Sequence, residues 1–446
     1  MTVPTFEERS NLTRSQLLIW TGQQLSPSAP LYNMAMAFRI HGPIVPDRFQ
    51  QAFGDVVAAC DALRTVVVSA ANLPHQRVLE RIDTPTEFID LYRSVDSEHD
   101  LQQCIKLRRQ RLFDPGQRMF ESVLLRLTPS EFVWYLNQHH LITDAWSTAL
   151  VYRWTSDRYL QLQGSPDFDS PAAPITPPPQ YRGYIEFERT WTKSPQFDRV
   201  RQYWHSRQQN LPPLPELYGR RRKQRSSRTE RLTFELGPDR SQQLDRFASD
   251  PDLRSLTREL TGLNVFLAVM FAWLHRVSGR ESLSIGTMSH NRAKPTFRST
   301  GGLFVELFPI VAEIGSAQTF AGLIRTIQQA SLSTLSNAGP GASDFCGREP
   351  FNTVLNYITS SFGNFAELPV TSTWVHAGHG DPDHLLRLQV HDMDATGRAV
   401  LHFDFNVEAF DERQRHWSVA HFVRMLDAFL EDPQRRIDSV SLPGTD

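Results

Sequence analysis

A proline-rich stretch near the middle of the chain constrains the fold most strongly, because it divides the sequence into two parts. Residues 163–180 contain Gly164, six prolines and few large apolar side chains. Proline fixes its own backbone and lacks an amide donor, so such a stretch forms neither a helix interior nor a central strand. We therefore predict an N-terminal lobe over residues 1–170 and a C-terminal lobe over 181–446, with residues 163–180 as the linker.

Length and composition agree with two lobes of an ordinary globular protein. A chain of 446 residues exceeds what one hydrophobic core usually supports. Hydrophobic residues make up 40% and charged residues 22%, and 47 Lys and Arg nearly balance 49 Asp and Glu. Because no strong net charge is present, we expect neither nucleic acid nor an anionic membrane as a partner. We also expect a monomer.

The cysteines and apolar runs predict a cytoplasmic protein. Cys60, Cys104 and Cys346 are far apart and show no CxxC spacing, which argues against a disulfide framework or a zinc-thiolate site. The first ten residues lack the apolar core of a secretory signal. The longest apolar run, residues 265–274, is too short to cross a bilayer, so we predict a buried helix there.

Hydrophobic periodicity predicts a mixture of strands and helices on both sides of the linker. Strands are expected at residues 33–40, 64–68, 121–127, 131–139, 233–236, 282–288, 305–311, 351–357, 385–390 and 399–405. Helices are expected at residues 12–20, 47–61, 101–112, 146–162, 181–207, 261–278 and 413–430. The fold class is therefore predicted as α/β, with two lobes of one plan.

The segment after the strand at 131–139 holds the strongest chemical signal, with His139, His140 and Asp144 inside six residues. Histidine titrates near neutrality and is the usual proton shuttle. If the strand continues, successive side chains point to opposite faces, so the two imidazoles diverge. We predict one imidazole at a reaction centre and the other packed behind it. The alternative is a pair of structural histidines at a strand end.

Further distinctive segments accompany His139–Ala145 in a fixed order along the chain. They are Leu12–Trp20 with Pro27 and Tyr32-Asn33, Leu63-Arg64-Thr65, Tyr181–Tyr184, Ile285–Thr287 with Asn291-Arg292, Gly302–Pro309 and Val354–Tyr357. This ordered series extends over most of the chain and resembles the condensation domains of nonribosomal peptide synthetases, within the chloramphenicol acetyltransferase-like superfamily. His139–Ala145 is similar to the HHxxxDG core of that family.

The resemblance implies a pseudo-dimer of two chloramphenicol acetyltransferase-like lobes, α+β sandwiches that meet in a V around a central tunnel. The implied activity is acyl transfer in nonribosomal peptide or hybrid polyketide biosynthesis. An acyl thioester on the phosphopantetheine arm of an acyl or peptidyl carrier protein would react with an amine or hydroxyl. The acceptor would be a small molecule or would be held by a second carrier, and the product an amide or ester. No metal or other cofactor is implied.

The resemblance also assigns roles to residues. His140 would handle the proton of the attacking amine or hydroxyl, and His139 would be structural. Asp144 would form an ion pair with Arg292 that anchors the site. A second group consists of candidates for the oxyanion site or the tunnel lining: Ala145, Ser147 and Asn356.

Several features leave alternatives open. Ala145 stands where the family usually has glycine, and Glu306 and Leu307 replace the usual Asn and Thr. The basic run Arg220, Arg221, Arg222 and Lys223 is either a solvated surface or a docking site for an acidic carrier protein. The loop 376–384 is rich in His and Asp, but its glycines and proline argue against a metal site. A noncatalytic recruitment domain or an epimerisation domain of the same fold are the functional alternatives, and the chain is either free-standing or excised from a larger synthetase.

Overall fold

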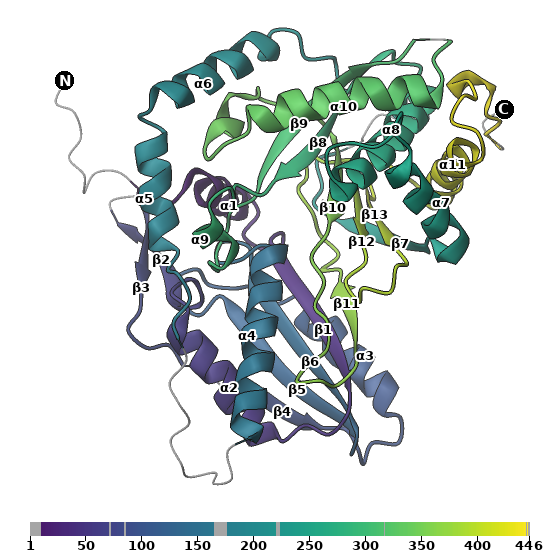
Figure 1. Cartoon of the computed structure of the whole chain (residues 1–446). Helices are drawn as coiled ribbons and strands as arrows, with labels where there is room; N and C mark the ends of the chain where they lie inside the picture. Colours follow the sequence, from purple (N-terminus) through teal and green to yellow (C-terminus); the bar gives the residue numbers. More distant parts are fainter. Residues whose placement is uncertain are drawn as a thin grey trace, which may run out of the picture.

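The computed structural model describes residues 10–70, 73–83, 86–164, 176–219, 224–315, 317–442 and 444. In Figure 1 the N-terminal half of the chain forms the lower lobe, and the C-terminal half forms the upper lobe. The central part of the predicted linker and the basic run at 220–223 lie outside the described residues. The prediction of two mixed α/β lobes is confirmed.

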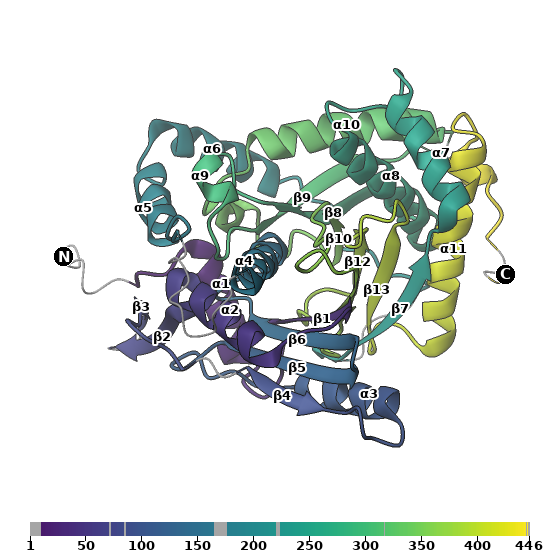
Figure 2. The same cartoon turned by 60° about the horizontal axis from the view of Figure 1, so that its bottom comes forward.

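The first lobe is built on a five-stranded sheet with the strand order β11-β1-β6-β5-β4. Its elements are α1 (Arg14–Leu25), β1 (Asn33–His41), α2 (Pro46–Ala59), β2 (Thr65–Ala70), β3 (Leu73–Val78), β4 (Glu87–Asp90), α3 (Ser97–Arg108), β5 (Phe120–Thr128), β6 (Glu131–His139) and α4 (Ala145–Gln163). β2 and β3 form a separate two-stranded sheet. Helices α2 and α4 cover one face of the larger sheet and α3 lies on the other (Figure 2).

The alternation of β6 decides which side chains each face of this sheet buries. Trp134 packs against α2, where Phe49 contacts it with ring centroids 5.1 Å apart. Val133 and Tyr135 belong to the smaller cluster on the opposite face, together with Leu101 of α3. The predicted alternation of this strand is therefore confirmed.

The second lobe is built on a six-stranded sheet with the order β7-β13-β12-β10-β8-β9. The elements after the linker are α5 (Arg182–Trp191), α6 (Pro195–Gln208), β7 (Thr229–Glu235), α7 (Gly237–Ser249), α8 (Arg258–Ser278), β8 (Ser282–Ser289), α9 (Pro295–Arg298), β9 (Glu306–Glu313), α10 (Phe320–Ser336), β10 (Thr353–Ile358), β11 (Val370–Val375), β12 (Leu386–His391), β13 (Val400–Asn406) and α11 (Glu412–Glu431). Short 3-10 turns occur at Ala62–Arg64, Ala342–Phe345 and Ile437–Ser439.

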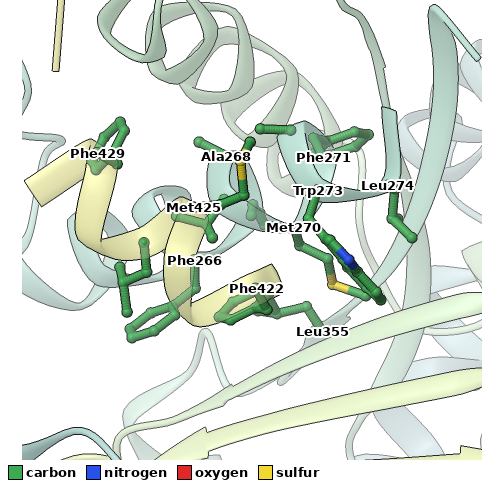
Figure 3. Close-up of a cluster of buried hydrophobic side chains, with 14 of the residues drawn as sticks. Phe266, Ala268, Met270, Phe271, Trp273, Leu274, Leu355, Phe422, Met425 and Phe429 are labelled. Atoms are coloured by element: carbon green, nitrogen blue, oxygen red, sulfur yellow. The ribbon is translucent and has the colours of Figure 1, made fainter. Parts of the chain in front are cut away.

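Helix α8 is the centre of the second core. Its apolar side chains pack against Phe422, Met425 and Phe429 of α11, as Figure 3 shows. Within the described part of the chain, α8 is the one helix long and apolar enough to cross a membrane, and 67% of its apolar window is buried inside the protein. The prediction of a buried helix in this segment is confirmed.

One strand from the second half of the sequence belongs to the first lobe. β11 pairs antiparallel with β1, in a register that places Thr373 opposite Ala37. Before this strand, Phe362 and Phe365 enter the core of the first lobe, where Phe362 packs 4.7 Å from Phe38 between ring centroids. The sequence analysis assigned no strand here. The range 181–446 predicted for the C-terminal lobe therefore includes a segment that completes the sheet of the other lobe.

Three further differences have local causes. The helix predicted over 181–207 is interrupted, because Ser194 caps a new helix and Pro195 occupies its first turn. The sequence analysis predicted no helix at α7 or α10. In α10 the signal was Thr319, whose side chain caps the helix by accepting from the amide of Gly322. The edge strand β4 was also missed, and its short length gives little periodic signal.

Candidate active site

The site begins where β6 ends and α4 starts. β6 ends at His139, and α4 begins at Ala145 after a turn of five residues. Asp144 is the N-cap of α4, because its carboxylate accepts a hydrogen bond from the amide of Ser147 at 2.7 Å. The turn that carries His140 is thus held at both ends by regular structure.

The two adjacent histidines have opposite hydrogen-bonding patterns. The Nδ1 atom of His140 lies 2.9 Å from the carbonyl oxygen of Thr143, which can only accept, so Nδ1 carries the proton. In His139, by contrast, Nδ1 accepts from the amide of Leu141 at 3.2 Å, and Nε2 lies 3.4 Å from Oε1 of Gln23. Both nitrogens of His139 are therefore engaged, whereas Nε2 of His140 is left as an unprotonated acceptor.

Burial and charge keep both imidazoles neutral. His139 is 1% exposed, and burial, assisted by the neighbouring His140, lowers its pKa to about 3. Burial also lowers the pKa of His140, and the negative charge of Asp144 opposes that shift while the positive charge of Arg387 adds to it. His140 therefore presents a neutral ring, the protonation state that a proton acceptor requires.

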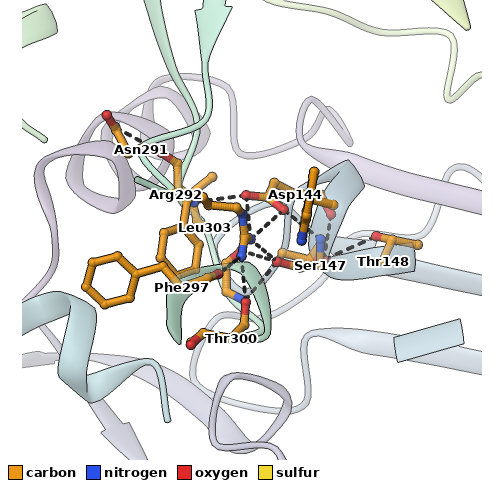
Figure 4. Close-up of polar contacts among 12 residues, drawn as sticks. Asp144, Ser147, Thr148, Asn291, Arg292, Phe297, Thr300 and Leu303 are labelled. Atoms are coloured by element: carbon orange, nitrogen blue, oxygen red, sulfur yellow. Dashed lines mark hydrogen bonds and ion pairs between the residues drawn. The ribbon is translucent and has the colours of Figure 1, made fainter. Parts of the chain in front are cut away.

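Asp144 forms the predicted ion pair with Arg292, and this pair joins the two lobes (Figure 4). Nη2 of Arg292 lies 3.0 and 3.1 Å from the two carboxylate oxygens. The amide of Phe304 donates a further hydrogen bond to Asp144 at 3.1 Å. Although burial opposes ionisation of Asp144, Arg292 and the amide donors hold its pKa below the ordinary value.

Ser147 extends the same network on the other side of Arg292. Its hydroxyl donates to the carbonyl of Gly302 at 2.6 Å and accepts from the amide of Gly302 at 3.0 Å and from Nη2 of Arg292 at 2.7 Å. Gly302 has a φ of 143°, and a Cβ there would lie 2.1 Å from the ring of Tyr181. The close approach of these two segments therefore requires glycine.

A cavity of about 920 Å³ lies between the lobes, and His140 is on its wall. The first lobe contributes residues of α1 and the start of β1, and the second contributes residues of β12 and β13 and the loops around 343–352 and 376–385. Asp144, Arg292 and His139 are not on this wall. The structure thus places His140 at the cavity and the ion pair and the second histidine behind it.

The remaining candidates occupy different places. Ala145 is half-buried at the start of α4 and has no positive φ, so glycine is not needed there. Ser147 and Asn356 are buried, and neither is on the wall of the cavity within the described residues. Arg220, Arg221, Arg222 and Lys223 lie outside the described residues.

The loop 376–384 uses its histidines in contacts within the protein. His376 Nε2 lies 3.0 Å from the hydroxyl of Thr229, and His379 Nδ1 lies 3.0 Å from that of Ser227. His384 stacks on Phe351. Among the described residues, no group of three or more His, Cys, Asp or Glu side chains is arranged to hold a metal ion.

The opposite wall of the cavity contains polar residues that the sequence analysis did not single out. Arg231 of β7 and Asp404 of β13 form a buried ion pair, with Nε and Oδ1 2.6 Å apart. Gln389 of β12 also donates to Asp404, and Arg387 lies beside it on the same strand. The sequence did contain a signal for this polar wall, because polar residues occupy alternate positions in β12 and β13. Such alternation indicates that one face of each strand is not buried in a core.

Known proteins are similar to this chain in sequence and in fold. The model of the condensation domain family matches residues 7–446. Phosphinothricin tripeptide synthetase PhsC of Streptomyces viridochromogenes is 27% identical over 73% of this chain, and a dimodular nonribosomal peptide synthase of Bacillus subtilis is 26% identical over 72%. The chain spans only 29% and 13% of the length of these two relatives.

Solved structures show the same fold. The starter condensation domain of rhizomide synthetase, a mutant in complex with C8-CoA, superposes with a TM-score of 0.85 at 21% identity, covering 97% of both chains. The first condensation domain of the CDA synthetase gives a TM-score of 0.83 at 20% identity, covering 97% of this chain and 99% of the other. This chain belongs to the condensation domain family of the nonribosomal peptide synthetases.

Proposed function

We propose that this chain catalyses acyl transfer from a carrier-bound thioester to an amine or hydroxyl acceptor, in the biosynthesis of a nonribosomal peptide or a peptide-polyketide hybrid. The observation that carries the proposal is the neutral His140 on the wall of the cavity, with its Nδ1 bound to the Thr143 carbonyl and its Nε2 left to accept a proton. Family membership supplies the donor, an acyl group on the phosphopantetheine arm of a carrier protein.

In the proposed reaction, the acceptor nitrogen or oxygen attacks the carbonyl carbon of the thioester. The acceptor proton passes to Nε2 of His140, the C–S bond breaks, and the proton leaves with the thiolate as a thiol. A thioester is already activated, so alignment of the two substrates and one proton transfer are sufficient. The reaction therefore needs no metal or redox cofactor.

Two neighbouring groups assist in this scheme without taking part in bond changes. As the first residue of α4, Ala145 has an amide N–H with no acceptor inside the helix, and it is the proposed donor to the developing oxyanion. Asp144 and Arg292 are positioning residues. They fix the start of α4 and thereby the turn that carries His140.

The test loads acyl groups on a carrier protein, adds amine and alcohol acceptors, and follows transfer by intact mass. We expect transfer by the parent chain, and a loss of about a hundredfold to ten-thousandfold in His140→Ala, the range that positioned proton transfer contributes. His416→Ala is the matched control, because His416 is exposed on α11, and its rate should equal that of the parent.

Other outcomes would contradict the proposal. Transfer by His140→Ala at the parental rate would remove His140 from the reaction. If no acceptor is acylated but the α-carbon of a tethered aminoacyl group is inverted, the chain is an epimerisation domain. If neither reaction occurs and the carrier still binds, it is a recruitment domain. The choice of an amine or an alcohol as acceptor distinguishes amide formation from ester formation.

The proposed location of the protein is the cytoplasm.

A further inference from the structure

A row of three charged residues crosses the sheet of the second lobe on the side that faces the cavity. Asp404 of β13 lies opposite Arg231 of β7 in one strand pairing and opposite Arg387 of β12 in the other. All three residues are on the wall of the cavity. The residues flanking Arg387, Leu386 and Leu388, point the other way into the core. The row therefore presents the charges plus, minus, plus to the interior of the cavity.

The central carboxylate of this row forms its ion pair with one of the two arginines. Nε and Nη2 of Arg231 lie 2.6 and 2.9 Å from the two oxygens of Asp404, a bidentate pair. Gln389 donates a third hydrogen bond to Asp404 at 2.7 Å. Burial opposes ionisation of Asp404, but Arg231 holds its pKa well below the ordinary range. Arg231 and Asp404 thus neutralise one another.

Arg387 has no such counter-ion. Among the residues the structure describes, no carboxylate lies within salt-bridge distance of its guanidinium, which contacts Nδ1 of His384 through Nη2 at 3.3 Å. The other arginines of the wall differ, because Arg225 is paired with Asp383 at 2.7 Å and Arg348 is exposed. Asp381 is on the same wall and the charge of Arg387 lowers its pKa, but no direct ion pair joins the two. Arg387 is therefore the half-buried arginine of the wall without a carboxylate in direct contact among the described residues.

The position of Arg387 links it to the reaction centre. His140 and Arg387 are on opposite lobes and on the wall of the same cavity. The charge of Arg387 also adds to burial in lowering the pKa of His140. A group bound to Arg387 would therefore lie in the same cavity as the nitrogen that accepts the proton. The phosphate of a phosphopantetheine arm is at the far end of that arm from the thioester, so it is not the anion for this position.

We propose that Arg387 binds a carboxylate of the acceptor substrate and thereby selects and orients the acceptor beside His140. The inference rests on the proposed acyl transfer and names its substrate class. A planar guanidinium fits a carboxylate with two parallel hydrogen bonds, which fixes orientation as well as affinity. The acyl donor is already held by its tether, so an acceptor gains most from such an anchor. The carboxylate belongs either to a soluble amino or hydroxy acid or to the acidic side chain of a carrier-bound aminoacyl group.

The first experiment compares acceptors that differ only in charge. Soluble amino acids are paired with their carboxamides, and carrier-bound aspartyl and glutamyl groups are paired with asparaginyl and glutaminyl groups. We expect the acid of one pair to be preferred by about tenfold to a hundredfold in kcat/KM, the range for a hydrogen bond to a charged group. The pair that shows the preference identifies the source of the carboxylate.

The variant Arg387→Gln should abolish that preference. The readout is the ratio of the rates with acid and with amide, because the charge of Arg387 also lowers the pKa of His140. Arg348→Gln is the matched control, because Arg348 is also on the wall but exposed at its edge, and it should retain the preference. Binding of each soluble acid and amide is measured separately by calorimetry, which needs no turnover. Arg387→Gln should weaken binding of the acid and not of the amide.

Two results would overturn the inference. Equal use of acid and amide in both the soluble and the carrier-bound series, with transfer intact, would refute the role of Arg387 and leave the proposed function standing. Acid preference or acid binding that persists unchanged in Arg387→Gln would assign the carboxylate site to another residue. An absence of transfer to every acceptor would contradict the proposed function itself, and the calorimetric comparison would then decide whether Arg387 binds carboxylates.

Discussion

Two buried aspartate–arginine pairs lie near the cavity, and they differ in what they hold together. Asp144 and Arg292 join the two lobes, with side chains that are 0% and 4% exposed. Asp404 and Arg231 join adjacent strands of one sheet, with side chains that are 8% and 10% exposed. The first pair lies behind the cavity wall, whereas the second is part of that wall.

The difference shows that a buried ion pair supports a site in two ways. Arg292 is enclosed by carbonyl oxygens and packs 3.8 Å over the ring of Phe304, so its pair fixes the geometry of the turn bearing His140. The pair of Asp404 and Arg231 faces the cavity, and each residue neutralises the charge of the other. It thereby leaves Arg387 as the charge available to a ligand.

Breaking the first pair should have the largest effect. Arg292→Met leaves Asp144 as an uncompensated buried charge at the junction of the lobes, and we expect a loss of about 3–5 kcal/mol in the free energy of unfolding. Acyl transfer should fall to the background rate. Denaturant unfolding and the intact-mass assay measure the two effects.

The control for this prediction is an exposed pair. Arg182→Gln removes the partner of Glu186 on α5, where both side chains are well exposed, and it should change the free energy of unfolding by less than about 1 kcal/mol. Equal stability of Arg292→Met and the parent would contradict the interpretation that this pair holds the lobes together.

Breaking the second pair should have a smaller effect. Asp404→Asn leaves Arg231 beside the cavity, where water reaches it and where it keeps a hydrogen bond to the carbonyl of Trp374 at 2.9 Å. We expect a loss of about 2 kcal/mol in the free energy of unfolding, the size of a hydrogen bond to a charged group. Acyl transfer should persist. If Asp404→Asn inactivated the protein as fully as Arg292→Met, the two pairs would not differ in the way described.

The histidines near the second pair should make part of the stability depend on pH. His391 is 7% exposed, neither ring nitrogen has a hydrogen-bond partner among the described residues, and its ring lies 4.9 Å from that of His402. Burial lowers its pKa to about 4. As pH falls, the unfolded chain takes up this proton first, so stability is complete above about pH 6.5 and is lost between about 6.5 and 4.

His391→Phe tests this expectation. It removes a buried polar ring without partners, so stability at pH 7 should be unchanged or higher. It also removes one titrating group, so the loss between pH 6.5 and 4 should lessen by about 1.4 kcal/mol per pH unit at most. The measurement is the free energy of unfolding at pH 7 and pH 5. A pH dependence equal to that of the parent would show that the pKa of His391 does not differ between the folded and unfolded chains.

The smallest effect is expected at the start of α4. Ala145→Gly restores the residue usual in the family, and the helical backbone of Ala145 does not require it. We expect a loss of at most about 1 kcal/mol in the free energy of unfolding, and a transfer rate within about twofold of the parent. A large rise in rate would show that the methyl group obstructs the substrate next to the Asp144–Arg292 pair.

Local sequence pattern was sufficient to predict much of the fold and the turn that carries His140. The alternation in β6 placed Trp134 and Tyr135 on opposite faces, and the apolar run of α8 predicted a buried helix. The adjacent histidines diverge as expected, although β6 ends at His139 and His140 lies in the turn, so strand alternation alone does not explain their divergence. Resemblance to the family paired Asp144 with Arg292, a partner 148 residues away that no local pattern indicates.

Long-range contacts account for what was missed. β11 carries no strong strand pattern because one of its faces is only half-buried at the edge of the sheet, and its place beside β1 depends on Phe362 and Phe365 entering the other lobe. The row of Arg231, Asp404 and Arg387 comes from strands far apart in the sequence. Each is an ordinary charged residue until the strands pair.

The sequence by itself determined the mixed α/β character, the strand-turn-helix unit that presents His140, and the family. Those features depend on neighbouring residues, whose relative directions follow from backbone geometry. The tertiary structure decided the tautomers of the two histidines, the charge left on Arg387 and the strand that crosses between lobes. These depend on which distant groups meet, and on how much water is excluded where they meet.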